Sequence, residues 1–264
     1  MNGFKYQNIT IGADPELFLK DKVSGGWVAA VGLVGGTKEK PKKIDKKGHA
    51  IQEDNVMVEF NIPPAKTEKK FVKSINHVLG HLAGILPQYN LVIEASATFP
   101  KEQLQHPQCM TFGCEPDYDA WNIIINPAPN PNTAIRTCGG HIHVGYDGVD
   151  DDNQVELIRA MDLFVCVPSV VLDPDKVRKS RYGRAGAFRP KAYGVEYRVV
   201  SNHWLRNNQL LSWVYNNTHK AIAFLNGGGK IDDALGARIQ EAINTGNEQL
   251  SANISKEFGA LSGV

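Results

Sequence analysis

Apolar and polar residues alternate along several short stretches of this chain, most regularly over residues 50–62. One parity of this stretch is polar: Glu53, Asn55, Met57, Glu59 and Asn61. The other parity carries Asp54, Val56, Val58, Phe60 and Ile62. Because successive side chains of a strand point to opposite faces, the pattern predicts one strand with its apolar face on a core. A face that is merely solvated gives the same alternation, so the polar face alone assigns no function.

Shorter strands are predicted at residues 8–12, 17–19, 91–98 and 195–199, and longer segments show helical periodicity. Residues 66–86 place Phe71, Ile75, Val78, Leu82 and Ile85 at helical spacing, with Thr67 as an N-cap. Further helices are predicted at 152–167, 206–225, 231–245 and 247–259. Strands followed by helices favour one large α/β or α+β domain, which 264 residues are enough to build.

Two histidines alternate with apolar residues in the stretch from Thr137 to Tyr146. In a strand, His141 and His143 emerge on the same face, where two imidazoles suit a metal ion, a phosphate or one of each. Gly139 and Gly140 precede them and would allow a bulky ligand to approach the backbone. Two ordinary half-buried histidines are the alternative interpretation.

Three other stretches repeat this arrangement of two polar residues on one strand face. Asp14 and Glu16 flank a proline that excludes a helix, and two neighbouring carboxylates repel each other unless a cation neutralises them. Glu53 and Glu59 share a parity, as do Glu196 and Arg198. Four such pairs are less readily explained as separate surface features than as one sheet face lined with acids, imidazoles and arginines.

Basic residues cluster in a glycine-rich segment before Glu196, and they outnumber the acids around them. The cluster consists of Arg178, Lys179, Arg181, Arg184, Arg189, Lys191 and Arg198. Arginines in a loop beside a strand suit a nucleoside triphosphate or a carboxylate bound by two hydrogen bonds. A solvated basic loop is the alternative.

Other features of the sequence carry weaker signals. Residues 25–41 are rich in glycine but lack P-loop spacing, so a hairpin with a flexible connection is expected, from which Lys38 would reach a phosphate as a mobile charge. Residues 99–136 form an irregular segment whose aromatic residues, within 112–121, indicate an ordered cover over a site. His77 and His81 have the spacing of a helical metal pair, but ordinary surface histidines are favoured.

Composition narrows the function classes. The net charge of +1 suggests neither nucleic acid nor a membrane as partner, and the basic stretch from Lys38 to Lys47 is typical of a solvated loop. Four cysteines without a C-x-x-C pair indicate a reducing compartment. The first residues lack the apolar core of a signal peptide, and no run of eighteen apolar residues occurs. A cytoplasmic protein is expected.

In order and approximate spacing, residues 12–200 resemble the glutamine synthetase superfamily of carboxylate–amine ligases, which includes the glutamate–cysteine ligases. The matching motifs are Asp14-Pro15-Glu16, the glutamates Glu53 and Glu59, Gly139-Gly140-His141-Ile142-His143, and the arginine-rich segment leading into Glu196-Tyr197-Arg198. Through the motif Asp54-Asn55-Val56-x-x-Glu59-Phe60, the sequence most resembles the short phage-type carboxylate–amine ligases. The chain is much shorter than a full glutamine synthetase, and Asp14 replaces the usual Glu.

This resemblance implies a single glutamine synthetase-like catalytic domain over residues 1–264. Its α+β fold would be a curved, mainly antiparallel sheet with the active site on the concave face and helices on the other. The implied reaction joins a carboxylate to an amine with ATP, through an acyl phosphate, with two Mg²⁺ or Mn²⁺ ions. If the gene belongs to a phage, the enzyme would act in the host cytoplasm.

The resemblance also implies roles for individual residues. One metal would be bound by Glu16, Glu53 and Glu59, and a second by Asp14, His141 and Glu196. His143, Lys191, Arg184, Arg189 and Lys38 would contact ATP, Arg189 and Lys191 also stabilising the transferring phosphoryl group. Arg198 or Arg184 would hold the acceptor carboxylate, and Glu59 or Asp117 would assist the amine as base.

The identities of the carboxylate and amine, small molecules or peptides, stay open, as does assembly into a homo-oligomer. A zinc-dependent hydrolase would use His141 and His143 with Glu196 and would need no ATP. A catalytically silent nucleotide-binding member of the fold is a further alternative. Guanidino kinases share the superfamily fold but release no amide.

Overall fold

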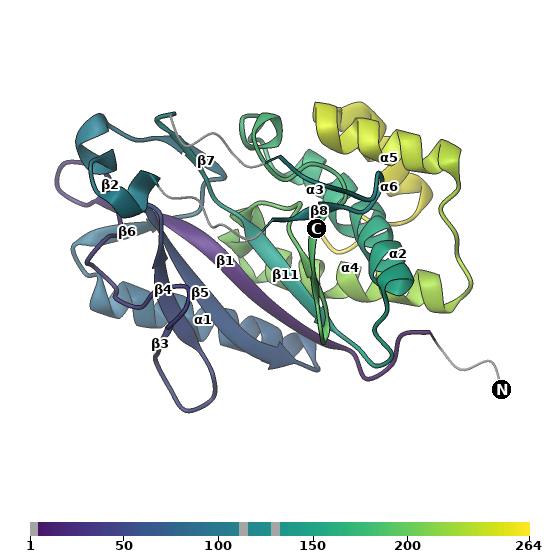
Figure 1. The fold of residues 1–264 in the computed structure, drawn as a ribbon, viewed down its shortest axis with the longest axis horizontal. Coiled ribbons are helices and arrows are strands. Elements are labelled where there is room, and N and C mark those ends of the chain that lie inside the picture. The colour runs from purple at the N-terminus through teal and green to yellow at the C-terminus, as the bar shows by residue number, and fades with distance from the viewer. Residues whose placement is uncertain (1–4, 111–115, 128–132) are drawn as a thin grey trace.

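The computed structural model describes residues 5–110, 116–127 and 133–264 (Figure 1). Within these residues eleven strands form one sheet. Its path runs β3 (Lys42–Lys43), β4 (Ala50–Asp54), β5 (Met57–Ala65), β1 (Thr10–Asp21), β11 (Gly140–Gly145), β13 (Gly194–Tyr197), β12 (Ala187–Lys191), β8 (Tyr118–Asp119) and β9 (Ile124–Ile125). Off this path, β2 (Trp27–Val28) and β6 (Tyr89–Val92) pair with β1. The expected large antiparallel sheet with helices is confirmed, since each of these pairings is antiparallel.

Strand β1 is the centre of the sheet and joins the two predicted strand pieces at 8–12 and 17–19 into one. It pairs with β11 on one side and with β5 on the other. The register sets Asp14 opposite His141 and Glu16 opposite Glu59. Because residues directly opposite each other in an antiparallel pair point to the same face, this register collects acids and imidazoles on one face.

The prediction of a single strand over residues 50–62 is wrong. The chain turns at Asn55 and Val56, and β4 and β5 form a hairpin in which Asp54 faces Met57 and Gln52 faces Glu59. Asn55 adopts a left-handed backbone conformation with φ of 54°, which asparagine tolerates better than most residues. The turn exchanges the parity of the side chains, so Asp54, and not Glu53, shares a face with Glu59.

The helices confirm the periodicity in the sequence. Helix α1 (Glu68–Ile85) begins at Thr67, whose hydroxyl accepts a hydrogen bond from the Lys70 amide at 3.3 Å. The segment predicted at 152–167 is α2 (Asp151–Met161), continued by a π-helical turn (Asp162–Cys166) and α3 (Val167–Leu172). The C-terminal helices are α4 (Asn208–Asn226), α5 (Asp233–Thr245) and α6 (Glu248–Glu257). Short 3₁₀ helices lie at Lys101–Leu104, Pro107–Met110, Arg178–Ser180 and Asn202–Arg206.

The two faces of the central sheet have different partners. One parity of the strands is apolar and fully buried, as at Leu17, Val58, Ile142 and Val195, and belongs to one core cluster with the apolar residues of the helices. Figure 1 shows α1 behind β5 and β1. The other parity carries the acids and imidazoles. The alternation along each strand therefore separates a packed face from a polar one.

Three connecting segments differ from expectation. Residues 91–98 belong to two strands, β6 and β7 (Ser96–Thr98), and β7 pairs with β10 (Ile135–Thr137) in a separate small sheet. The basic segment before Glu196 is not simply a loop, because β12 and β13 form a hairpin there. The segment 99–136 includes β8, β9 and two 3₁₀ turns, but Phe112–Glu115 of its predicted cover lie outside the described residues.

Cys109, Cys138 and Cys166 are buried and are not joined in disulfides. Among the helices that the structure describes, none is both long and apolar enough to cross a membrane.

Candidate active site

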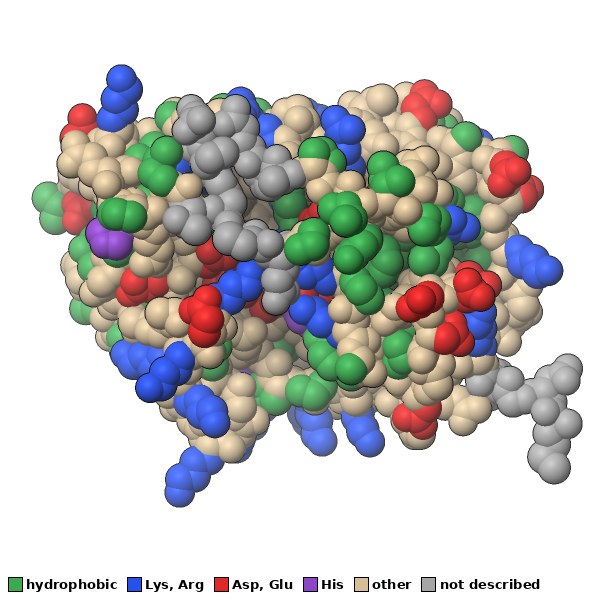
Figure 2. Space-filling model, in the orientation of Figure 1, with side chains coloured by type: hydrophobic (Ala, Val, Ile, Leu, Met, Phe, Trp, Pro, Cys, Tyr) green, Lys and Arg blue, Asp and Glu red, His purple; other side chains and the backbone are tan. Residues whose placement is uncertain are grey.

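A pocket of about 880 Å³ opens on the polar face of the sheet. Figure 2 shows acidic and basic side chains gathered around a hollow near the centre of this face of the molecule. Eleven of the predicted site residues line the pocket: Asp14, Glu16, Lys38, Glu59, Asp117, His141, His143, Arg189, Lys191, Glu196 and Arg198. The pocket therefore joins residues from β1, β5, β11, β12 and β13, and Arg198 directly after β13, that are far apart in the chain.

Three carboxylates form the first cluster, which we call the acidic trio: Glu16, Asp54 and Glu59. Each offers an oxygen within 4.8 Å of the others. Burial, reinforced by repulsion from Asp54, raises the pKa of Glu16 to about 8. Burial and the neighbouring acids raise the pKa of Glu59 well above its ordinary value, and burial raises that of Asp54. The neighbouring cations of the protein thus do not offset the cost of ionising these buried carboxyl groups together.

A second cluster, the mixed trio, consists of Asp14, His143 and Glu196, whose ligand-type atoms also lie within 4.8 Å of one another. Asp14 Oδ1 is 2.8 Å from His143 Nε2, while His143 Nδ1 is 2.5 Å from the Tyr193 hydroxyl. Burial opposes protonation of His143, but the Asp14 carboxylate outweighs it and raises the pKa of this imidazole. His143 therefore carries positive charge more readily than a free histidine.

His141 lies beside this cluster in a different electrostatic environment. Its Nδ1 is 3.7 Å from Asp14 Oδ1 and 3.3 Å from a guanidinium nitrogen of Arg198. Burial and the positive charge of Arg198 lower the pKa of His141 well below its ordinary value. A neutral imidazole has a lone pair available, and the Nε2 of His141 is buried with no hydrogen-bond partner among the described residues.

Glu196 lies at the centre of the positive end of the pocket. Lys191 Nζ is 2.8 Å from Oε2, and Arg189 and Arg198 both contact Oε1, Arg189 at 3.3 Å. Burial would raise the pKa of Glu196, but Arg198 and the neighbouring histidines hold it well below its ordinary range. The carboxylate is thus ionised and holds three cationic side chains side by side.

Arg198 connects this end of the pocket to Asp117, a candidate base from the sequence. Asp117 Oδ2 lies 3.5 Å from Arg198 Nε and accepts a hydrogen bond from the Tyr182 hydroxyl at 3.0 Å. Arg198 Nε in turn donates to the same hydroxyl at 2.6 Å. Both Asp117 and Tyr182 line the pocket, and the contacts position Asp117 at its wall.

Two residues assigned to the site from the sequence lie elsewhere. Glu53 points to the opposite side of its strand, where its carboxylate accepts hydrogen bonds from the amides of Gly32, Val34 and Gly35 at 2.8, 3.1 and 2.8 Å. It anchors the glycine-rich loop instead of joining the acidic trio. Arg184 is exposed and does not line the pocket, because it precedes the β12 strand that carries Arg189 and Lys191 inward.

The residue that the sequence assignment of ligands missed is Asp54. It appeared in the motif Asp54-Asn55-Val56 but received no role, because residues 50–62 were taken as one strand. An Asn flanked by two alternating runs is a hairpin signal, and it would have moved Asp54 to the face of Glu59.

The paired glycines before His141 are required for close packing within the protein. A side chain at Gly140 would meet the Ser201 carbonyl oxygen at 2.1 Å and the Trp204 indole nitrogen at 2.3 Å. At Gly139 it would meet the ring of His141 at 2.2 Å, and the Gly139 amide donates to Glu16 Oε2 at 2.5 Å. These glycines allow close packing around β11, whereas the sequence suggested room for a ligand.

The donor set fits divalent cations on two observations. The acidic trio holds three crowded carboxylates with raised pKa values, which a cation would restore to the ionised form. In the mixed trio, the buried atoms Asp14 Oδ1 and His143 Nε2 face each other at 2.8 Å, and the buried Nε2 of the neighbouring His141 has no hydrogen-bond partner among the described residues. Carboxylate oxygens with one or two imidazoles suit Mg²⁺ or Mn²⁺.

Comparison with known proteins finds a similarity over the second half of the chain. Residues 131–250 match the family model described as phage phiEco32-like COOH.NH2 ligase-type 2, which confirms the resemblance to phage-type carboxylate–amine ligases over this part of the chain. The matched region includes His141, His143, Arg189, Glu196 and Arg198.

Eight chains among solved structures match, and no curated protein does. One match is the crystal structure of a bifunctional glutathione synthetase from Pasteurella multocida, with 8% sequence identity and a TM-score of 0.46. The alignment covers 95% of this chain and 49% of that chain, so this protein spans about half the length of the structure it matches.

Proposed function

We propose that the protein is an ATP-dependent carboxylate–amine ligase that forms an amide, peptide-like or isopeptide-like, through an acyl phosphate, with two divalent cations. One observation carries the proposal: a single pocket holds two clusters of carboxylates and imidazoles, and three cationic side chains gather around Glu196 of the second cluster. The family match over residues 131–250 supports the same reaction class.

The chemistry explains why such a pocket needs both charges. A carboxylate is a poor electrophile, because an amine would have to expel an oxide ion. Transfer of the γ-phosphoryl group from ATP to a carboxylate oxygen releases ADP and leaves an acyl phosphate. The amine then attacks the acyl carbon, the C–O bond to phosphate breaks, and the amine loses a proton. The first step brings two anions together, and the second releases an anionic phosphate, so positive charge must be provided in both.

Divalent cations, when bound, would screen the phosphates and neutralise charge at the transferring phosphoryl group. Glu16, Asp54 and Glu59 would hold one ion, and Asp14, His143 and Glu196 a second, with the neutral His141 beside it. Arg189 and Lys191 would exchange part of their contact with Glu196 for phosphate oxygens. Lys38 reaches the rim of the same pocket and would add a mobile positive charge.

Arg198 would orient the acceptor carboxylate, because its guanidinium is fixed by Glu196 and Tyr182 at the pocket wall. Asp117 lies at the same wall and would accept the proton that the amine loses, a role for which Glu59 is the other candidate. Burial keeps the pKa of Glu59 high, as a general base requires, but a cation bound to it would remove its lone pairs from this task.

Our proposal extends to the whole chain. We assign residues 1–264 to one catalytic domain of the glutamine synthetase-like class, acting in the cytoplasm on small-molecule or peptide substrates. The large antiparallel sheet, polar on one face and packed with helices on the other, supports this architecture. Neither nucleic acid nor a membrane is a proposed partner, and assembly into a homo-oligomer is left to measurement.

The test is release of phosphate from ATP in the presence of Mg²⁺ and mixtures of amino acids and amines. We expect release that requires both a carboxylate and an amine, with the amide detected by mass spectrometry. The Glu196→Gln variant should lose most of its turnover, and Arg184→Ala, an exposed position, serves as the matched control. Turnover without ATP by a zinc-loaded protein would favour a hydrolase. Nucleotide binding without turnover on any amine would favour a silent member of the fold.

A further inference from the structure

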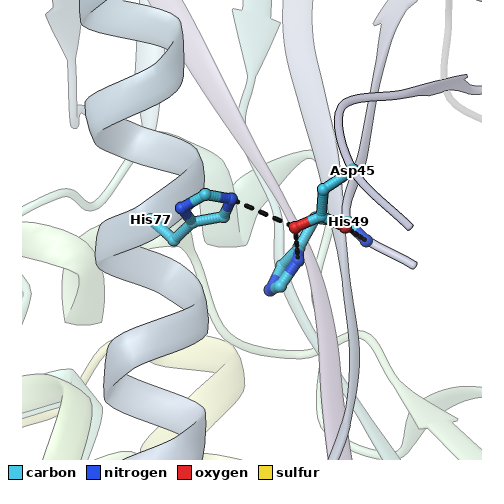
Figure 3. A group of neighbouring side chains, drawn as sticks. All are labelled: Asp45, His49 and His77. Carbon is cyan, nitrogen blue, oxygen red and sulfur yellow. Dashed lines mark hydrogen bonds and ion pairs between the residues drawn. The ribbon is translucent and has the colours of Figure 1, made fainter. Parts of the chain in front are cut away.

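Three side chains far from the pocket converge on one point (Figure 3). Asp45 lies in the loop between β3 and β4, His49 directly precedes β4, and His77 lies on α1. Asp45 Oδ2 is 2.7 Å from His49 Nδ1 and 3.2 Å from His77 Nε2. The two rings are 4.8 Å apart between centroids. None of the three residues lines the pocket described above.

The cluster is more than a surface hydrogen bond. His49 is 5% exposed, and its Nε2 is buried without a hydrogen-bond partner among the residues that the structure describes. The Asp45 carboxylate is itself fixed, since its Oδ1 accepts from the Lys47 amide at 2.7 Å. The carboxylate is therefore held in place before any ligand arrives.

The separations match those of a tetrahedral metal centre. Zinc binds imidazole nitrogen and carboxylate oxygen at roughly 2.0–2.2 Å, so ligand atoms in a tetrahedron lie about 3.3 Å apart. The distances of 2.7 and 3.2 Å from Asp45 Oδ2 need only small side-chain movements to reach this arrangement. Figure 3 shows a ring nitrogen of each histidine directed at the same carboxylate oxygen.

We infer that Asp45, His49 and His77 form a binding site for a divalent transition-metal ion of the zinc class. Such ions bind a set of two imidazoles and one carboxylate more readily than Mg²⁺ does, because Mg²⁺ prefers oxygen ligands. His77 is half exposed, with 49% of its side chain accessible, so a water molecule has access to a fourth coordination position. The ion would replace the protons that His49 and His77 direct at Asp45.

The site would act as a clamp between two parts of the fold. His77 is on α1, whereas Asp45 and His49 belong to the β3–β4 connection at the edge of the sheet. The loop before β3 carries Lys38, which lines the pocket. A bound ion would therefore stabilise the sheet edge from which Lys38 reaches the pocket, without contributing a ligand to the pocket itself.

The test is zinc binding by the whole protein in excess Mg²⁺, which competes for the oxygen-rich pocket clusters. We expect wild-type protein to retain one more equivalent of zinc than His77→Ala or His49→Ala after buffer exchange. Co²⁺ should give the visible absorption of a tetrahedral centre in wild type but not in His77→Ala. Zinc should also raise the thermal midpoint of wild type by several degrees and that of His77→Ala by less.

Two variants separate this site from its alternatives. His81→Ala lies one turn further along α1 and should retain zinc like wild type; loss of the extra equivalent there would overturn the three-residue ligand set. Glu196→Gln changes the pocket and should keep the clamp, measured as the same zinc-induced stabilisation. Equal zinc content in wild type and His77→Ala would overturn the inference. Phosphate release by zinc-free His77→Ala in Mg²⁺ should stay near that of wild type, because His77 does not touch the pocket.

Discussion

Both ends of the pocket contain glutamate carboxyl groups, but the pKa values of these groups are shifted in opposite directions. In the acidic trio, burial and mutual repulsion raise the pKa of Glu16 to about 8 and that of Glu59 well above normal. At the other end, Lys191, Arg189 and Arg198 surround Glu196, and its pKa is held far below normal. One end lacks positive charge and suits a cation, whereas the other has an excess and suits an anion.

This difference in charge would favour one orientation of a bound ligand in the pocket. An ATP molecule with its cations would place metal-bound oxygens toward the acidic trio and its transferring phosphoryl group toward Arg189 and Lys191. The residues that create the difference come from adjacent strands, so the charge separation follows from strand order. The experiments below test whether the two ends act as this contrast requires.

The largest effect is expected from Glu196→Gln. Removing this charge leaves three cationic side chains without their shared carboxylate and takes a ligand from the mixed trio. Turnover should fall by about 10²–10³-fold, the range found when one group that stabilises transition-state charge is lost. Phosphate release under saturating ATP measures it. A single cooperative unfolding transition serves as the control, and activity near wild type would show that Glu196 only fixes its neighbours.

Arg189→Ala should separate chemistry from binding. If Arg189 stabilises the transferring phosphoryl group, kcat should fall by about 10²-fold while the KM for ATP changes much less. Initial rates over a range of ATP concentrations provide both values. Arg189→Lys should recover part of kcat, because it restores charge without the planar geometry. Equal losses in kcat and in ATP affinity would instead make Arg189 a binding residue.

Glu59→Gln should raise the stability of the metal-free protein and reduce the stabilisation caused by added metal. Burial and the neighbouring acids disfavour the ionised form of Glu59, and glutamine avoids this cost, so the metal-free protein should unfold about 2–4 °C higher, equivalent to roughly 1 kcal/mol. The stabilisation caused by added Mg²⁺ or Mn²⁺ should shrink in the same variant. Thermal melts with chelator and with metal give both numbers. Lower stability in the metal-free variant would contradict the repulsion between these acids.

Titration of Glu16 should make the stability of the protein depend on pH. Its pKa is raised from 4.5 to about 8, so the native state binds more protons than the unfolded state between these values. The stabilising contribution is complete below about pH 4.5 and is lost as pH rises through about 8. Buried Asp162, with its pKa raised to about 6, contributes in the same sense between about pH 4 and 6.

Melting curves of the metal-free protein from pH 6.5 to 8.5 cover the interval in which Glu16 titrates and Asp162 is largely titrated, and the difference between wild type and Glu16→Gln gives the Glu16 part. Glu16→Gln should flatten the slope in this interval, and saturating Mg²⁺ should flatten it in wild type. An unchanged slope in both cases would mean that Glu16 is ionised throughout and that the acidic trio is less strained than its burial indicates.

The smallest effects distinguish the rim from the surface. Lys38→Ala should raise the KM for ATP several-fold, since Lys38 lines the pocket but no ion pair fixes it among the described residues. Arg184→Ala should change KM by less than twofold and stability by less than about 0.5 kcal/mol, because its side chain is exposed. ATP titrations of both variants under identical conditions make the comparison. A larger rise in the KM for ATP in Arg184→Ala would indicate that Arg184 does contact ATP.

The sequence by itself determined the features that depend on neighbours along the chain. Asp14 with Glu16, and His141 with His143, share faces because a strand alternates, and Thr67 begins α1 because a hydroxyl satisfies a free amide. These signals need only two to four residues. They also located the acid-x-acid, His-x-His and Glu-x-Arg motifs of the phage-type ligase resemblance.

Only the tertiary structure decided which side chains meet. A turn at Asn55 placed Asp54 beside Glu59 and sent Glu53 to the glycine-rich loop, because a change of direction exchanges the two faces of a strand. The hairpin of β12 and β13 brought Arg189 and Lys191 to Glu196, and packing of α1 brought His77 to Asp45. Such contacts depend on strand register and helix packing, which arise from the energy of the whole core and leave no local pattern in the chain.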